Sequence, residues 1–378
     1  MLKIKNILLF TFKVINIFIK KKNIILFYST PDISDNALAY YYHIRDKYRC
    51  IWVIKDEVFA KKIIQIEKIK NIEYIRINSL KEIYYSLISK IHINTHGSGY
   101  KKFNFSKYPL IVSLWHGSPI KKIGKDINET PCKQDILISG SDFFTPIMIR
   151  SIASKNCKVV STGLPRNDWL TKRSSSTLSN NFKCKEKIVI WMPTFVKSRQ
   201  QPSSNKIFDD GKILNGHISF LSLSDFFLLN ETLSSLNLIL YIKLHPFDIL
   251  NEVDFSSYDY NNIKIIKSDN PDFMGSKLYC MLSESSGLIS DLSSVIFDYI
   301  YTSNLIGIDT YSYKNYTRPM YFELDHSQLN SFIIYNIETL IQYLKKINNE
   351  NLYKKSIYIY ESSESFCTNV EKVINENL

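Results

Sequence analysis

The sequence predicts an α/β protein made of two doubly wound domains, each with a parallel sheet. Short apolar runs alternate with helical patterns along most of the 378 residues, which is typical of βαβ units. A polar, serine-rich stretch at 172–177 interrupts this alternation once. The chain is also long enough for two domains of ordinary size. We therefore expect one domain over 1–175 and a second over 176–378.

The strands expected in the first domain are short runs rich in Ile, Val, Leu and aromatic residues. They cover 24–28, 50–54, 73–77, 91–94, 110–114, 137–140 and 158–161. Helical patterns lie between several of these runs, with Asp35-Asn36 at the start of the first one. The others cover 57–69 and 143–153.

The second domain repeats this plan. Its expected strands cover 187–191, 238–243, 263–267, 287–290 and 305–309, and a final helical region covers 337–347 and 352–359. The chain has no Walker loop, Gly-x-Gly-x-x-Gly run or Gly-x-Ser-x-Gly elbow. These absences argue against a P-loop kinase, a dinucleotide oxidoreductase and a serine hydrolase.

Positive charge is concentrated in the first half of the chain. The net charge is +12, and the first 178 residues contain 30 Lys/Arg against 13 Asp/Glu. This balance predicts an anionic partner such as membrane lipid, a phosphorylated acceptor or nucleic acid, although ordinary surface lysines also account for it. The segment Met1 to Lys22 has six lysines and no acid. It predicts either a basic amphipathic helix on an anionic membrane surface or simply the first helix of the domain.

The stretch after the strand at 110–114 carries the clearest chemistry. The strand ends in Trp115-His116-Gly117-Ser118-Pro119, followed by Lys121, Lys122 and Lys125. Open α/β sheets bind ligands at the carboxyl ends of their strands. We therefore interpret His116 as the base of a phosphoryl-type transfer, with the lysines facing an anionic substrate. The alternative is a core histidine beside a solvated lysine turn.

A second strand, 238–243, also ends at a histidine, in Lys243-Leu244-His245-Pro246. If the two domains face each other, His116 and His245 flank one substrate. The strand at 287–290 runs into Asp291-Leu292-Ser293-Ser294, where a helix begins, and we expect Ser293 and Ser294 to bind a diphosphate. The alternative is ordinary helix capping.

Two further loops are candidates for the site. The loop after 187–191 contains Thr194, Lys197 and Arg199, which are suited to contact phosphates. Arg166 lies in the turn Leu164-Pro165-Arg166-Asn167-Asp168, where it either contacts substrate or only shapes the turn. No set of metal ligands stands out, and none of the six cysteines forms a C-x-x-C pair, so no metal or organic cofactor is predicted.

The order of these motifs resembles the CDP-glycerol glycerophosphotransferases, which include teichoic acid primases and polymerases and related capsule enzymes. The resemblance extends over about residues 30 to 325 and rests on seven segments. They are Asp35-Asn36-Ala37, 114–126, Ser139-Gly140-Ser141-Asp142, 162–168, Met192-Pro193-Thr194-Phe195, Lys243-Leu244-His245-Pro246 and 290–299. The chain departs from the family where Val196 follows Phe195, because an arginine is usual there, so Lys197 or Arg199 would have to replace that contact.

The resemblance implies two Rossmann-like domains in the glycosyltransferase B arrangement. It implies transfer of a polyol phosphate from CDP-glycerol or CDP-ribitol to a hydroxyl of a lipid-linked or polymeric glycan, with release of CMP. His116 would be the base, and His245 would assist at the donor phosphates. The other donor-side residues would be Thr194, Lys197, Arg199, Lys243, Asp291, Ser293 and Ser294. The acceptor-side residues would be Asp35, Asn36, Gly117, Ser118, Lys121, Lys122 and Arg166. The resemblance also implies a peripheral position on the cytoplasmic face of the plasma membrane.

Two other functions remain open at this point. A nucleotide-sugar glycosyltransferase would have the same two-domain architecture, because fold does not fix function. A basic nucleic-acid or membrane-binding module without catalysis would explain the charge but not the two histidines at strand ends. Since no aromatic-basic single-strand motif or zinc finger is present, no nucleic-acid partner is predicted. The acceptor and the oligomeric state are left open.

Overall fold

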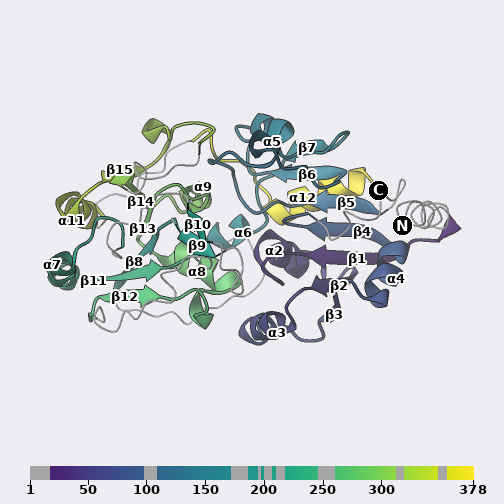
Figure 1. Ribbon diagram of the computed structural model, residues 1–378, viewed down its shortest axis with the longest axis horizontal. Coiled ribbons are helices and arrows are strands. Elements are labelled where there is room, and N and C mark those ends of the chain that lie inside the picture. The colour runs from purple at the N-terminus through teal and green to yellow at the C-terminus, as the bar shows by residue number, and fades with distance from the viewer. Residues whose placement is uncertain are drawn as a thin grey trace.

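The computed structural model describes residues 18–97, 109–171, 186–194, 197–199, 207–209, 218–245, 260–311, 319–347 and 356–378. Most of the basic segment Met1 to Lys22 and the expected boundary at 175–176 lie outside these residues. The described chain forms two lobes, each built on one large sheet (Figure 1). The predicted fold class, two doubly wound Rossmann-like domains, is confirmed.

The first lobe has a seven-stranded sheet in the order β3-β2-β1-β4-β5-β6-β7, with every neighbouring pair parallel. Its strands are β1 (Lys22–Tyr28), β2 (Arg49–Ile54), β3 (Glu73–Arg76), β4 (Ser89–Asn94), β5 (Leu110–Ser113), β6 (Ile136–Ser139) and β7 (Lys158–Ser161). Its helices are α2 (Asp35–Ile44), α3 (Glu57–Ile66), α4 (Leu80–Ile88), α5 (Thr145–Ser151) and α6 (Asn167–Leu170), with the 3-10 turn η2 (Gly124–Ile127).

The second lobe has a six-stranded parallel sheet in the order β12-β11-β8-β13-β14-β15. Its strands are β8 (Lys187–Met192), β11 (Leu238–Lys243), β12 (Ile263–Ile266), β13 (Gly287–Ser290), β14 (Leu305–Asp309) and β15 (Ser331–Ile334). β9 (Lys197–Arg199) and β10 (Ile207–Asp209) form a separate antiparallel pair. Its helical elements are α7 (Leu223–Ser235), η5 (Pro271–Phe273), α8 (Ser276–Glu284), α9 (Val295–Tyr299), η6 (Ile300–Thr302), η7 (His326–Gln328) and α11 (Ile337–Lys346). The last helix, α12 (Phe366–Glu376), belongs to the first lobe.

The C-terminal end differs from the sequence-based expectation. Half of the expected helix over 352–359 lies outside the described residues, and the described half, 356–359, is a turn. Tyr358 in this turn is buried among aromatic rings that include Phe143 and Phe297. The helix α12, which the sequence reading did not predict, packs against α2 in the first lobe (Figure 1). Asp168 fixes its start by accepting hydrogen bonds from the backbone N–H groups of Phe366 and Cys367, at 2.7 and 2.9 Å. The end of the chain therefore crosses back from the expected second domain. α4 and β15 were also not predicted.

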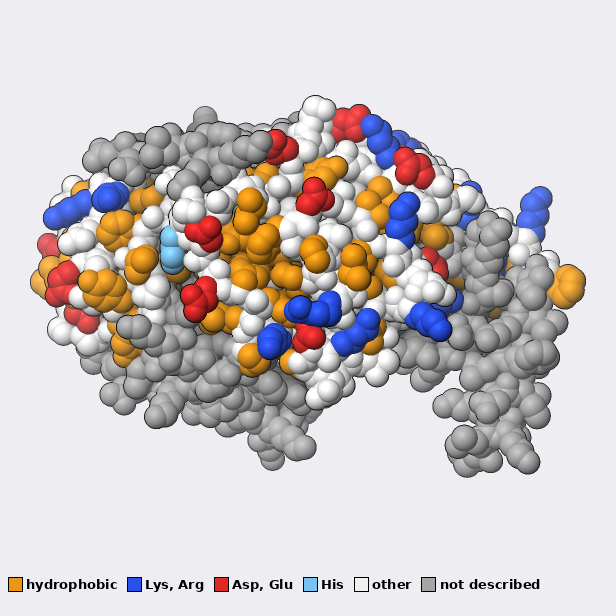
Figure 2. Space-filling view, turned by 90° about the horizontal axis from the view of Figure 1, so that it is seen from above, with side chains coloured by type: hydrophobic (Ala, Val, Ile, Leu, Met, Phe, Trp, Pro, Cys, Tyr) orange, Lys and Arg blue, Asp and Glu red, His pale blue; other side chains and the backbone are white. Residues whose placement is uncertain are grey.

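Apolar packing is continuous between the lobes. One buried cluster contains Leu137 and Phe144 from the first lobe together with Leu288 and Phe297 from the second. Hydrophobic side chains also gather in the middle of the face seen in Figure 2, flanked by Lys and Arg side chains. Because burial of apolar area drives association, this shared cluster holds the two sheets in one arrangement. None of the helices within the described residues is long and apolar enough to span a bilayer.

The strand registers place the carboxyl ends of each sheet at a common edge. In the first lobe Tyr28 lies opposite Asn94, which lies opposite Ser113, so the loops after β1, β4 and β5 leave the sheet together. In the second lobe Met192 lies opposite Ser290. Chain order reverses between β1 and β4 and between β8 and β13, and ligands bind at such switch points.

Candidate active site

A cavity of about 400 Å³ lies where these two edges meet. This volume is within the range of small-molecule sites. Its first-lobe wall is Trp115, His116, Gly117, Ser118, Pro119, Ile120, Lys121 and Ile123, and its second-lobe wall is Met192, Pro193, Thr194, Lys243, Leu244, His245, Leu278, Leu292, Ser293 and Ser294. The structure thus brings the two predicted strand-end histidines, 129 positions apart in the chain, to one cavity.

His116 is held in a defined orientation after β5. Its Nδ1 lies 3.3 Å from the carbonyl oxygen of Thr95, and because a carbonyl only accepts, Nδ1 carries the proton. The lone pair is therefore on Nε2. Burial lowers the pKa of His116, with Arg166 acting in the same direction and Asp35 and the Thr95 carbonyl opposing. A neutral imidazole with a lone pair on Nε2 is suited to accept a proton.

His96 is a neighbour of His116 that the sequence reading missed. The two rings stack with centroids 4.0 Å apart and planes at 8°. Thr95 connects them, since its hydroxyl lies 2.9 Å from His96 Nδ1 and its carbonyl contacts His116. His96 follows the end of β4 as His116 follows β5, so the pattern that identified the other two histidines was present here as well.

The second-lobe wall brings His245 and Lys243 close to a first-lobe lysine. Burial lowers the pKa of His245 to about 3, and the charges of Lys243 and Lys121 add to this effect. Burial alone lowers the pKa of Lys243 to about 8. The backbone at Lys121 pairs with Met320 of the second lobe, and Lys121 lines the cavity. The cavity therefore presents two lysines, one from each lobe, beside a neutral imidazole, which suits an anionic ligand.

Gly117 lies where the His116 loop packs against Ser294 of the second lobe. Its φ is +152°, and a Cβ placed on it would lie 2.6 Å from Ser294 Oγ and 3.2 Å from Arg166 Nη2. Only glycine fits at this contact. Ser293 and Ser294 are half-buried and line the cavity. The Ser294 hydroxyl, one of the two expected to bind phosphate, therefore lies directly beside the loop that carries His116.

Asp291 and Thr194 contact each other. The Asp291 carboxylate accepts hydrogen bonds from the backbone N–H of Thr194, at 3.1 and 2.9 Å, from the Thr194 hydroxyl, and from Leu292 N at 2.6 Å. The predicted donor-side Asp291 thus connects the ends of β8 and β13. Lys197 and Arg199 belong to β9, and their side chains lie outside the described part of the structure.

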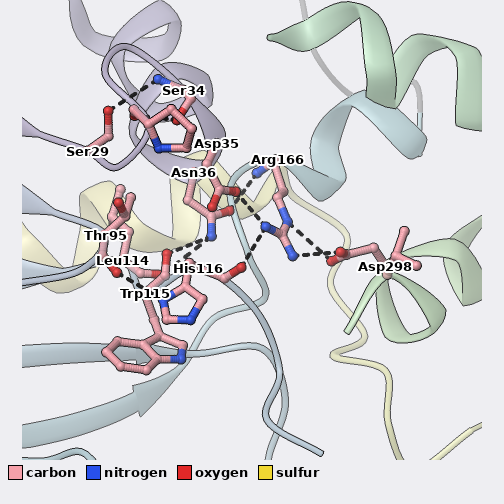
Figure 3. A network of polar contacts seen from close by, with 12 residues as sticks. Ser29, Ser34, Asp35, Asn36, Thr95, Leu114, Trp115, His116, Arg166 and Asp298 are labelled. Atoms are coloured by element: carbon pink, nitrogen blue, oxygen red, sulfur yellow. Dashed lines mark hydrogen bonds and ion pairs between the residues drawn. The ribbon is translucent and has the colours of Figure 1, made fainter. Parts of the chain in front are cut away.

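The predicted acceptor-side residues Asp35, Asn36 and Arg166 form a buried network (Figure 3). Arg166 Nη1 donates to Asp35 Oδ1 at 2.5 Å and to the carbonyl of His116 at 2.8 Å, while Nη2 donates to Asp298 Oδ2 at 2.6 Å. Asn36 is fully buried and donates to the carbonyl of Trp115 at 3.0 Å. Asn36 and Arg166 thus contact protein groups and hold the His116 loop.

The remaining acceptor-side candidates lie along the same loop. Ser118 is buried and packs near Gly140, where a Cβ would lie 2.7 Å from Ser118 Oγ. The backbone N–H of Lys122 donates to the carbonyl of Pro319 at 2.9 Å, which ties the loop to the second lobe. Within the described residues no group of three or more His, Cys, Asp or Glu side chains forms a metal-binding cluster.

Comparison with known proteins adds to this geometry. A family model described as CDP-Glycerol:Poly(glycerophosphate) glycerophosphotransferase matches residues 8–370. A "Teichoic acid poly(glycerol phosphate) polymerase" of Bacillus spizizenii is 24% identical over 401 residues, covering 94% of this chain and 91% of its own. A "Teichoic acid glycerol-phosphate transferase" of Staphylococcus aureus is 25% identical over 395 residues, covering 95% and 92%.

Solved structures agree in fold. The wall teichoic acid polymerase TagF superposes with a TM-score of 0.71 at 18% identity, covering 99% of this chain and 94% of that chain. A variant of the same polymerase soaked with CDPG superposes with a TM-score of 0.69 at 18% identity, covering 95% and 90%.

Proposed function

The chain belongs to the CDP-glycerol:poly(glycerophosphate) glycerophosphotransferase family, and from this premise we propose that it transfers glycerol phosphate from CDP-glycerol to an acceptor hydroxyl. One observation carries the proposal: His116 and His245 line the same cavity, together with Lys121, Lys243 and two serine hydroxyls. This combination offers a base on one wall and groups for a diphosphate on the other.

The proposed reaction begins with the acceptor hydroxyl against Nε2 of His116. His116 takes the hydroxyl proton as the oxygen attacks the β-phosphorus of the donor. A new P–O bond forms, the bond between the β-phosphorus and the bridging oxygen breaks, and CMP leaves with the electron pair. Ser293, Ser294 and Lys243 hold the diphosphate and the leaving group, and His245 contributes an N–H.

The finer parts of the proposal concern the acceptor and the place of action. We propose a lipid-linked or polymeric glycan acceptor in teichoic acid or capsule synthesis, because the relatives are named as teichoic acid enzymes. We also propose peripheral association with an anionic membrane, supported by the six lysines of Met1 to Lys22. Neither a metal nor an organic cofactor is part of the proposal. Turnover abolished by EDTA and restored by Mg²⁺ would contradict that part.

The substitution His116→Ala tests the central claim. Removing a general base typically lowers the rate by about 10² to 10⁴. We expect CMP release from CDP-glycerol to fall by that factor in a protein that still binds donor. His326→Ala is the matched control, because His326 contacts Ser331 beside η7 and does not line the cavity. Wild-type turnover in His116→Ala would refute the role of His116.

Donor and acceptor are tested with the unmodified chain. Purified protein is incubated with CDP-glycerol, CDP-ribitol or a panel of nucleotide sugars, each with a lipid-linked acceptor, and the products are analysed by mass spectrometry. We expect an acceptor mass gain of one or more glycerol phosphate units. Transfer from a nucleotide sugar alone would favour the glycosyltransferase alternative.

A further inference from the structure

Arg166 is a buried charged residue that contacts both lobes. Its side chain is only 5% exposed, as is expected of a charge that is fully paired. It contacts Asp35 at the start of α2, the backbone of His116, and Asp298 in α9 of the second lobe (Figure 3). One guanidinium thus joins three segments that are far apart in the chain.

Two of these segments carry the chemistry proposed above. Arg166 donates at 2.8 Å to the carbonyl of His116, the residue assigned as the base. Asp298 lies four positions after Ser294, so the same guanidinium also holds the start of the segment with the phosphate-binding hydroxyls. Gly117 contacts both the guanidinium and Ser294, because a Cβ on Gly117 would be 3.2 Å from Arg166 Nη2 and 2.6 Å from Ser294 Oγ. Arg166 therefore contacts both the loop that carries the base and the helix that follows the phosphate site.

The shape of the guanidinium matters as much as its charge. Two carboxylates and a carbonyl surround its planar fork, and the Tyr279 ring lies 5.4 Å from its Cζ. Burial disfavours its charge, but Asp298 and Asp35 more than offset this effect and raise its pKa well above the usual value. A lysine keeps one positive charge but lacks the rigid fork, so it cannot reproduce all three contacts.

We propose that Arg166 is a positioning residue for the transfer, and that it sets the distance from His116 to the hydroxyls of Ser293 and Ser294 across the lobes. This inference rests on the proposed function. It gives Arg166 a role distinct from substrate contact, because its guanidinium is enclosed by protein groups.

The first test is kinetic. Misplacing reacting groups by about 1 Å can cost about 10² in rate. In Arg166→Lys we expect kcat to fall about 10²-fold while KM for CDP-glycerol changes less than about threefold. Arg49→Lys is the matched control, because Arg49 pairs with Glu73 at 2.7 Å at the opposite end of the first-lobe strands and is half exposed. A loss confined to KM, or unchanged turnover, would overturn the proposal.

The second test does not depend on turnover. The charged and titratable groups that face His116 are Asp35, Arg166 and His96. Asp35 raises the pKa of His116 and Arg166 lowers it, so Arg166→Met should raise this pKa, while Arg166→Lys should change it less. The pKa is followed by NMR of labelled histidine, with His116→Ala to assign the signal. An unchanged titration in Arg166→Met would contradict the geometry.

Outcomes of the two tests separate the two claims. If the wild-type protein does not turn over CDP-glycerol, the proposed function is refuted. If the pKa of His116 nevertheless shifts in Arg166→Met, the contact between Arg166 and His116 still holds. Asp298→Asn serves if both Arg166 variants fail to fold, because it removes the charge from the second-lobe side only. We expect kcat to fall while KM for CDP-glycerol changes little. A change in KM with kcat unaffected would overturn the proposal.

Discussion

Lys243 gives the sharpest test of how the cavity binds the donor. It is the last residue of β11 and is only 6% exposed. Burial lowers its pKa to about 8, so the unliganded protein loses this positive charge as the pH rises through that value. A bound diphosphate favours the charged form and raises the pKa again. The effect of pH on Lys243 should therefore appear in kcat/KM, which reports ionisations of the free protein, more than in kcat.

The size of the effect follows from the titration of one group. One pH unit above a pKa near 8, about a tenth of the molecules keep a protonated Lys243. We therefore expect kcat/KM for CDP-glycerol at about pH 9 to be about a tenth of its plateau. On the acid side the plateau should extend below pH 6.5, because the lowered pKa of His116 keeps it neutral there.

The assay measures initial rates of CMP release at low donor concentration across this pH range. In Lys243→Arg the fall in kcat/KM above about pH 8 (the basic limb of the profile) should disappear, because arginine stays protonated. In Lys243→Met the plateau value of kcat/KM should fall. Lys277→Met is the control, since Lys277 is a partly exposed lysine of α8 paired with Asp272. A wild-type profile that stays level to about pH 10, or a basic limb that persists in Lys243→Arg, would refute the reasoning.

Three further substitutions test the architecture. Gly117→Ala should lower kcat about 10- to 100-fold, because the new Cβ lies 2.6 Å from Ser294 Oγ. The loss of kcat should be smaller in a Ser294→Gly background, and additive losses in this double-mutant cycle would be inconsistent with the contact. Phe144→Ala should lower the free energy of unfolding by about 3–5 kcal/mol, since Phe144 is fully buried in the cluster shared by the lobes. A loss of less than about 1 kcal/mol in a urea titration would contradict a role for Phe144 in holding the lobes together. Asp168→Ala should lower the free energy of unfolding by about 1–2 kcal/mol and increase hydrogen exchange in α12, because Asp168 accepts hydrogen bonds from the first two backbone N–H groups of that helix. Unchanged exchange in α12 would show that apolar packing alone holds the helix.

Strand positions were the part of the fold most accessible from sequence. The ranges expected for β7, β11, β13 and β14 match the structure residue for residue. Their apolar runs are short, rich in Ile, Leu and Val, and bounded by polar turns, so the local pattern suffices. α12 also carries a local helix pattern, because Ser365 caps its start and Phe366, Val370 and Ile374 lie on one buried face, but the prediction overlooked it. Its position depends on the cap from Asp168, almost 200 residues earlier, and on contact with α2.

The sequence by itself determined most strands of the two large sheets, the family resemblance and the two histidines at strand ends, because each is a local pattern of residue types. Only the tertiary structure decided that Arg166 faces Asp298 and that His96 stacks on His116. Those contacts join segments from different strands or different lobes. Their geometry depends on how the sheets align and pack, and the order of residues along one strand does not encode that alignment.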